Sequence, residues 1–182
     1  MHGSYRLMFL FVGFLVLSSA CGGGGGGGGG GPTAPSVANI AGLWNGTATI
    51  GDASGCGCVS TTYNNLARGS QLAYTDQITQ NGSSITGRTT HNDTGLWCDY
   101  TGTVSSSSWS RNATQCNVTY IAGFRCSNGN WRDLSLVALT DQGTVSGNVM
   151  TGDTAETWNC FNSSTGAGVG VLTLRTSLRQ TR

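Results

Sequence analysis

The sequence predicts an all-β domain, an antiparallel up-and-down β-barrel of about eight to ten short strands. From Ile40 onward, apolar and polar residues alternate with a period of two, as in half-buried strands. Charged residues make up only 9 % of the 182-residue chain, and 30 glycines suit tight turns better than long helices. Sequential hairpins with short loops favour a closed barrel, which leaves no exposed edges, and a β-sandwich is the alternative.

The first strand covers residues 44–50, where Trp44, Gly46, Ala48 and Ile50 share one face. The second covers residues 72–78, and Asn81-Gly82 then predicts a hairpin turn into a return strand at 84–90. Clusters of Ser, Asn, Asp and Gly predict turns at 105–108, 127–130, 141–143 and 163–168. Between these turns, strands are expected at 96–104, 109–115, 118–124, 131–140, 144–150, 154–161 and 169–178.

The N-terminus is typical of an export signal. Residues 1–20 place Arg6 before an apolar run at 7–17 that is too short to span a bilayer. Ser18-Ser19-Ala20-Cys21 resembles the bacterial lipobox, although Ser18 stands where that motif prefers Leu. The resemblance implies that Cys21 becomes an acylated N-terminus carrying chains such as palmitate; cleavage by an ordinary signal peptidase and simple secretion are the alternative.

A glycine tether favours the lipid anchor. Gly22–Gly31 is an unbroken glycine run, continued by Pro32-Thr33-Ala34-Pro35-Ser36. A flexible coil of this kind reaches roughly 20–25 Å for about 18 residues, which suits a domain held clear of a membrane. We therefore divide the chain into a signal peptide at 1–20, a lipidated tether at 21–39 and a barrel domain at 40–182. Gly22 resembles cargo sorted to the outer membrane of a bacterium that has two.

The charge balance argues against nucleic-acid binding. All nine basic residues are arginines, and with Arg6 removed they match the eight acids of the exported part. No basic stripe is present to neutralise phosphates. The predicted partners are the membrane, through the lipid, and an unidentified ligand or protein.

The cysteines predict disulfides. Apart from Cys21, six remain, an even number that fits an oxidising compartment. A hairpin loop at 105–108 places Cys98 opposite Cys116. Of the other four, Cys56 and Cys58 are each expected to pair with one of Cys126 and Cys160, and the order is open. A metal site built on Cys56 and Cys58 with His91 or Cys98 is the rival interpretation.

We find no pattern typical of an enzyme. The mature chain has one histidine, His91, in an apparent turn, and no G-x-S-x-G elbow accompanies it. Glu156 is the sole glutamate, and a glycosidase couple with an Asp has no further support. Neither a cofactor nor a metal is expected, and a weak hydrolase activity ranks last among the hypotheses.

Four residues are candidates for binding. Asp76 shares the core face with Tyr74 and Ile78, so it either meets an Arg inside or reaches water at a barrel rim. Trp97 and Asp99 lie on the opposite parity to the neighbouring apolar residues, which predicts an exposed Trp suited to sugar or protein. Trp109 lines a cavity in one interpretation and packs in the core in the other.

Gly42-Leu43-Trp44 at the head of the first strand resembles the G-x-W of the calycins, which include lipocalins, fatty-acid-binding proteins and avidins. The segment 80–87 is similar to the second hairpin of avidin-like barrels, and the layout resembles small bacterial lipoproteins. The resemblance implies that Trp44 closes one end of the barrel under an Arg from the last strand, Arg175 or Arg179. It carries no ligand over to this chain.

Two functional hypotheses follow. The first is an envelope lipoprotein whose barrel binds a small apolar or amphipathic ligand, or a partner at an aromatic rim. The second is a structural or interaction lipoprotein whose barrel is filled by side chains. A connected interior cavity separates them.

Overall fold

The structure, a computed structural model, describes residues 36–56, 58–60, 62–63, 66–126 and 129–182. The predicted signal peptide, the lipidation residue Cys21 and most of the tether lie outside the described residues. Every element in the described part is a strand, and no helix there is long and apolar enough to span a bilayer.

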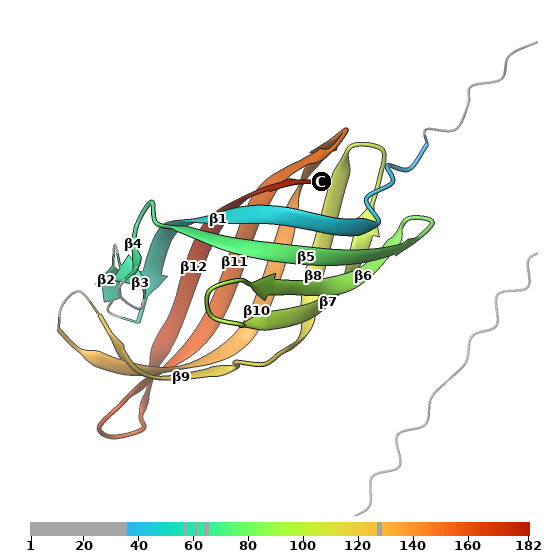
Figure 1. The fold of residues 1–182 in the computed structure, drawn as a ribbon. Helices are drawn as coiled ribbons and strands as arrows, with labels where there is room; N and C mark the ends of the chain where they lie inside the picture. Colours follow the sequence, from blue (N-terminus) through green and yellow to red (C-terminus); the bar gives the residue numbers. More distant parts are fainter. Residues whose placement is uncertain (1–35, 57, 61, 64–65, 127–128) are drawn as a thin grey trace, which may run out of the picture. The chain divides into compact units, whose positions relative to one another are not determined.

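Eight antiparallel strands close a barrel, as predicted (Figure 1). Each strand pairs with the next along the chain, and the last returns to the first, so the sheet is not a sandwich. The barrel strands are β1 (Gly42–Gly55), β5 (Gln71–Asn81), β6 (Ser84–His91), β7 (Trp97–Val104), β8 (Ser108–Cys116), β10 (Trp131–Ser146), β11 (Val149–Asn162) and β12 (Gly168–Thr181).

Four short strands lie outside this ring. β2 (Cys58–Ser60) pairs with the end of β1, and β3 (Thr62–Tyr63) pairs with β4 (Leu66–Ala67). β9 (Tyr120–Arg125) pairs with the first residues of β10, beyond the segment of β10 that pairs with β8. The long strands β10, β11 and β12 thus extend past β8 as far as β9 (Figure 1).

The two hairpins predicted from turn residues, β5–β6 and β7–β8, both form. Asn81 pairs with Ser84, so Gly82 and Ser83 make a two-residue turn, one residue later than the predicted Asn81-Gly82. Val104 pairs with Trp109 around the serine loop, and a register shift between Tyr100 and Asp99 then brings Cys98 opposite Cys116. The Cys98–Cys116 disulfide forms there, with Cα atoms 4.1 Å apart.

The second disulfide links Cys56 to Cys160, which resolves half of the open pairing. It joins the end of β1 to the end of β11, with Cα atoms 6.1 Å apart. Cys126 is disulfide-bonded as well, while the side chain of Cys58 lies outside the described residues. That the third bridge joins these two stays a prediction.

The predicted turn at 141–143 is wrong, as is the separate strand at 144–150. β10 continues through Gly143, and the chain turns only at Gly147 and Asn148. A Cβ on Gly143 would lie 1.9 Å from the carbonyl oxygen of Thr151 on β11. The glycine therefore serves a close approach of two backbones within the barrel wall, which resembles a turn signal in sequence.

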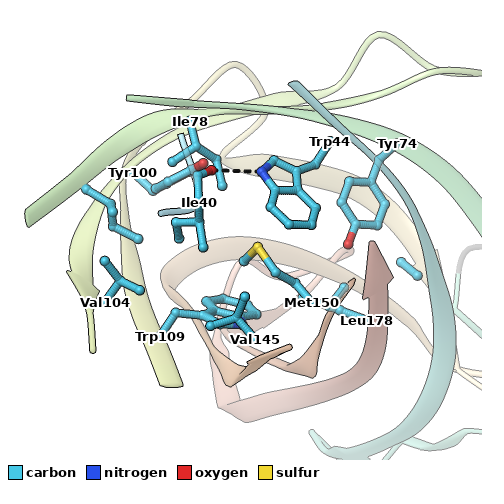
Figure 2. Packing of buried hydrophobic residues seen from close by; sticks show 12 residues of the cluster. Ile40, Trp44, Tyr74, Ile78, Tyr100, Val104, Trp109, Val145, Met150 and Leu178 are labelled. Atoms are coloured by element: carbon cyan, nitrogen blue, oxygen red, sulfur yellow. Dashed lines mark hydrogen bonds between the residues drawn. The ribbon is translucent and has the colours of Figure 1, made fainter. Parts of the chain in front are cut away.

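The interior holds two apolar clusters. The first contains Trp44, Tyr100, Trp109 and Met150, whose side chains point toward one another (Figure 2). The second lies around Phe124, Leu134, Trp158, Leu172 and the Cys56–Cys160 bridge, where β9 meets the extended strands. We call these the Trp44 cluster and the Phe124 cluster.

Trp44 is fully buried, as its position in the alternation predicts, and its Nε1–H donates to the Ile40 carbonyl at 2.8 Å. The predicted partners Arg175 and Arg179 are wrong, because both point outward from β12. Arg182, the residue after β12, covers the indole instead, with its guanidinium carbon 5.0 Å from the ring centroid. It also donates to the carbonyls of Ala41 at 2.9 Å and Asn39 at 3.1 Å. Gly42, at the start of β1, has a φ of 122°, which side-chain-bearing residues rarely adopt.

Candidate ligand-binding site

A layer of charged side chains crosses the barrel near the Trp44 cluster. Asp76 on β5, Arg111 on β8 and Asp141 on β10 occupy inward positions of their strands and are all buried. Asp76 and Arg111 alternate with buried residues two positions away, and Asp141 alternates with half-buried ones between exposed neighbours, which is how a strand directs side chains to one face. We call these three residues, together with Tyr74, Tyr100 and Gln180, the charged layer.

Arg111 joins the two carboxylates of the layer. Its Nε donates to Asp141 Oδ2 at 2.6 Å, and its Nη1 donates to Asp76 Oδ2. The guanidinium carbon lies 4.0 Å from the centroid of the Tyr100 ring. Burial lowers the pKa of Arg111, but the carboxylates of Asp141 and Asp76 outweigh it and raise the pKa above its ordinary value. The guanidinium is therefore always charged.

Asp76 is the most connected acceptor of the layer. Tyr100 donates its hydroxyl to Asp76 Oδ1 at 2.5 Å, and Gln180 donates Nε2 to Oδ2 at 3.1 Å. The Gln180 Nε2 also donates to the Tyr74 hydroxyl at 2.8 Å. Burial raises the pKa of both tyrosines, so both remain protonated donors.

The layer has more acceptors than donors. One guanidinium meets two carboxylates, which leaves a formal net charge of −1 among Asp76, Arg111 and Asp141. Two buried oxygen atoms, Asp141 Oδ1 and Gln180 Oε1, have no hydrogen-bond partner among the described residues. Because an unpaired buried acceptor costs about 1–3 kcal/mol, the layer favours an additional donor.

Glu156 lies beside Asp141, on the side of the layer that faces the Phe124 cluster. On β11, Glu156 pairs with Leu139 while the next inward residue, Thr154, pairs with Asp141, so the two acids are diagonal neighbours on one face. Trp158 Nε1–H donates to Glu156 Oε2 at 3.0 Å. Burial raises the pKa of Glu156 to about 7, with the charge of Asp141 acting in the same direction.

Inward residues around Glu156 are only partly buried. Glu156 itself, Leu139 and Leu136 keep intermediate exposure, although the pairing of Leu139 with Glu156 and of Leu136 with Trp158 directs them inside. His91, at the end of β6, is also partly exposed, and burial lowers its pKa, which favours the neutral imidazole. By contrast, Trp44, Tyr100 and Trp109 at the other end are buried. The inward residues between the charged layer and the Phe124 cluster are therefore less completely buried than those of the Trp44 cluster.

The structure brings together two of the four sequence-predicted binding residues. Asp76 is fully buried and meets an Arg, the first of the two alternatives. Trp109 packs in the Trp44 cluster, where its Nε1–H donates to the Thr144 carbonyl at 3.2 Å. The guanidinium carbon of Arg111 lies 5.2 Å from the centroid of the Trp109 ring, so Trp109 packs against the charged layer.

Trp97 and Asp99 lie elsewhere, on the outer face of β7. Arg88 on β6 covers the Trp97 ring at 3.8 Å and donates to both oxygens of Asp99 at 2.7 and 2.9 Å. Trp97 is consequently half-buried under a guanidinium rather than openly exposed. The hydrogen bonds from Arg88 lower the pKa of Asp99. Arg88 thus covers one face of the ring that Trp97 would offer to a partner.

The sequence analysis did not single out Arg111, Asp141 or Gln180, and considered Glu156 only as part of a glycosidase couple. Arg111 follows Trp109 by two positions, which was a signal for a shared inward face. Asp141 was assigned to a turn, so its parity was not considered. Gln180 lies two residues beyond Leu178, the last residue of the predicted strand.

A hollow open to solvent, with a volume of about 780 Å³, is bordered by β7, β8, β10, β11 and β12. Its lining includes outward residues such as Thr103, Ser110 and Asp153 and the buried residues Val104, Trp109 and Leu178. Among the described residues, no group of three or more His, Cys, Asp or Glu side chains could hold a metal ion.

No protein-family model matches the chain, and no curated protein matches it. A search of solved structures found similarity to a protein of unknown function of the DUF3598 family from Nostoc punctiforme. The match has 12 % identity and a TM-score of 0.24, and covers 78 % of this chain. It covers 49 % of the other chain, so this chain spans about half the length of that protein.

Proposed function

We propose that this chain is an exported, lipid-anchored envelope protein whose barrel binds a small amphipathic ligand. One observation carries the binding role: the two ends of the interior differ. Side chains fill the Trp44 end, whereas inward residues near Glu156 keep contact with solvent. Polar groups of the charged layer on one side and apolar residues such as Leu136 and Leu139 on the other suit a ligand with a polar head and an apolar body.

The disulfides support the exported location. Cys98–Cys116 and Cys56–Cys160 persist in oxidising compartments and are rare where thiols are kept reduced. The calycin relationship belongs to the same proposal. Its support is a closed barrel in which a buried Trp at the head of the first strand is covered by the Arg that follows the last.

The binding role is tested with Nile red, an uncharged dye that fluoresces in apolar sites, added to the exported Cys21→Ser protein without detergent. We expect saturable binding of one dye per chain. Leu139→Trp should abolish it by filling the interior. Val137→Trp is the matched control, because Val137 lies two residues away on β10 and is 57 % exposed. Absence of saturable binding by the wild-type protein contradicts the proposal.

The second candidate function is that of an interaction module with no ligand inside. An aromatic surface favours it: Tyr120 and Trp131 are 55 % and 53 % exposed on β9 and β10. Asp133 accepts the Tyr120 hydroxyl at 2.9 Å, and Arg125 lies 5.7 Å from the Trp131 ring centroid, so the aromatic rings are held in place. A protein that binds no dye yet loses a cell-envelope partner on Trp131→Ala would have this function.

A further inference from the structure

The interior of the barrel has an unbalanced negative charge beside the partly exposed residue Glu156. Asp76 and Asp141 share the single guanidinium of Arg111, and Glu156 adds a third carboxyl group on the neighbouring strand. Asp141 is 6 % exposed, and its Oδ1 has no partner among the described residues. An isolated buried acceptor of this kind requires a donor.

We propose, as a refinement of the binding role above, that the ligand carries an ammonium-type cation, which Asp141 Oδ1 and the Glu156 carboxylate hold. Diagonal neighbours on one face of a sheet are about 7–8 Å apart, which leaves space for one ammonium group between two carboxylates. The hydroxyl-bearing Thr154 lies inward on β11, opposite Asp141 and two residues before Glu156, and its partner Thr176 on β12 is also buried. Both threonines offer further acceptors to an N–H donor.

The apolar part of the ligand has a defined place as well. Leu139 pairs with Glu156 on one side, and Leu174 pairs with it on the other. Leu136 then continues toward Trp158 and the Phe124 cluster. A linear or compact aliphatic amine would direct its head to the acids and its body along these leucines.

The interior should prefer a cation to an anion, because the other charged side chains that face it do not cancel the negative charge of the carboxylates. Among the described residues, the inward titratable groups are Tyr74 and Asp76 on β5, His91 on β6, Tyr100 on β7, Arg111 on β8, Asp141 on β10 and Glu156 on β11; β1, β9 and β12 direct apolar or uncharged side chains inside. Arg111 is bonded to two carboxylates. Arg132, farther along β10, donates to the Cys56 and Trp131 carbonyls at 3.4 and 3.0 Å.

The proposal implies a direction of pH dependence. Protonated Glu156 is neutral and attracts a cation less, so affinity should rise as the pH increases through about 7. His91 does not oppose this trend, since its lowered pKa keeps the imidazole neutral at pH 7 and above. Binding of the ammonium group should also release a proton from Glu156, which appears as a buffer-dependent heat.

The test compares hexylammonium, 1-hexanol and hexanoate by isothermal titration calorimetry on the Cys21→Ser protein, with Nile red displacement in parallel. We expect hexylammonium to bind best, and more tightly at pH 8 than at pH 6. Glu156→Gln should lower its affinity roughly 10- to 100-fold, as expected for loss of a charge-assisted hydrogen bond, and should remove the pH dependence. Asp153→Asn is the matched control, because Asp153 lies on the same strand but faces outward.

Each other result is decisive. If Nile red binds but hexanol or hexanoate equals or exceeds hexylammonium, or if Glu156→Gln leaves the preference intact, the cation site is refuted while the barrel remains a ligand-binding module. If Nile red binds but no hexyl compound does, the cation site is likewise refuted. If Nile red does not bind either, the binding role itself fails. Asp141→Asn gives an independent second variant, and its near-UV circular dichroism establishes whether the core is intact.

Discussion

At the scale of single residues, Arg111 is the buried cation that pairs with two buried carboxylates. Its side chain is 2 % exposed and neutralises part of the charge of Asp76 and Asp141. Buried ion pairs contribute little net stability relative to apolar residues, but removing one partner leaves the other charge uncompensated. The charged layer therefore adds little to the net free energy of folding. Its main effect is to favour the strand arrangement that brings Asp76, Arg111 and Asp141 together.

We accordingly expect Arg111→Ala to lower the free energy of unfolding by about 3–5 kcal/mol, measured by urea denaturation at pH 7. Arg88→Ala is the control, since its pair with Asp99 lies on the exposed outer face and is screened by water. An Arg111→Ala protein as stable as Arg88→Ala would contradict the role assigned to the charged layer.

Trp44 and Arg182 provide a second prediction. Trp44→Ala should lower the free energy of unfolding by about 3–5 kcal/mol, because it removes a fully buried large aromatic ring. Arg182→Ala should lower it less, by about 0.5–2 kcal/mol, through loss of the guanidinium over the ring. Arg175→Ala and Arg179→Ala remove the same charge from outward positions of β12 and should leave stability near that of the wild type. Equal effects of all three arginines would refute the contact.

At the scale of strands, glycines at inward positions make space for the large side chains of the layer. Tyr74 lies against Gly46 on the neighbouring strand, so closely that an added Cβ would be 2.3 Å from the Tyr74 Cζ atom. Gly87 stands in the same relation to Tyr100, whose hydroxyl would lie 2.5 Å from such a Cβ. Aromatic rings over strand glycines also permit the sharp coiling that a small barrel needs.

Gly46→Ala should therefore displace Tyr74 and weaken its hydrogen bond from Gln180. We expect a loss of about 1–3 kcal/mol, the usual cost of overpacking, measured by thermal or urea unfolding. Gly168→Ala is the matched control, because Gly168 has no neighbouring atom within 4 Å of an added Cβ. A Gly46→Ala protein with wild-type stability would mean that the ring moves without cost.

The sequence predicted the features that depend on neighbouring residues along the chain and missed those that depend on contacts between distant strands. Period-two alternation identified most strands, and loop symmetry around 105–108 identified the Cys98–Cys116 pair, because both depend on neighbours along the chain. Gly143 produced a false turn, since a glycine that allows close backbone approach has the same local sequence as a turn. Arg182 was missed because its contact with Trp44 joins the two ends of the domain, and no local pattern encodes such a contact.

Most of the candidate site could not be predicted from the sequence, because its residues come from different strands. Parity placed Asp76 on the core face, and that was correct. Its partners Arg111 and Gln180 come from β8 and β12, so their meeting depends on closure of the barrel. Glu156 shares the inward parity of Thr154 and Trp158 on β11, but Leu139 and Asp141 face the same side only because of the bulge between Leu136 and Ala138 on β10, which local alternation does not reveal.

At the scale of the whole molecule, the barrel is closed by chain-terminal contacts and by disulfides. β12 pairs with β1, and Arg182 reaches the carbonyls of Asn39 and Ala41, so the end of the chain is fastened to the start of the domain. Cys56–Cys160 closes a sequence separation of 104 residues, against 18 for Cys98–Cys116. Disulfides of this kind contribute about 2–4 kcal/mol each, which matters in a domain with few apolar residues.

The last prediction concerns how this domain is held in the cell. We expect the mature protein to begin at Cys21 and to carry acyl chains, since the residues before Cys21 resemble a lipobox and a glycine run follows it. One acyl chain gives only marginal membrane binding, whereas two or more give stable anchoring, so a lipidated protein should remain with the membrane fraction. Mass spectrometry of the N-terminal peptide measures the modification directly, and Cys21→Ser should release the protein into the soluble fraction. A soluble wild-type protein that begins at an unmodified Cys21 would show instead that the chain is simply secreted, with the glycine run serving no anchor.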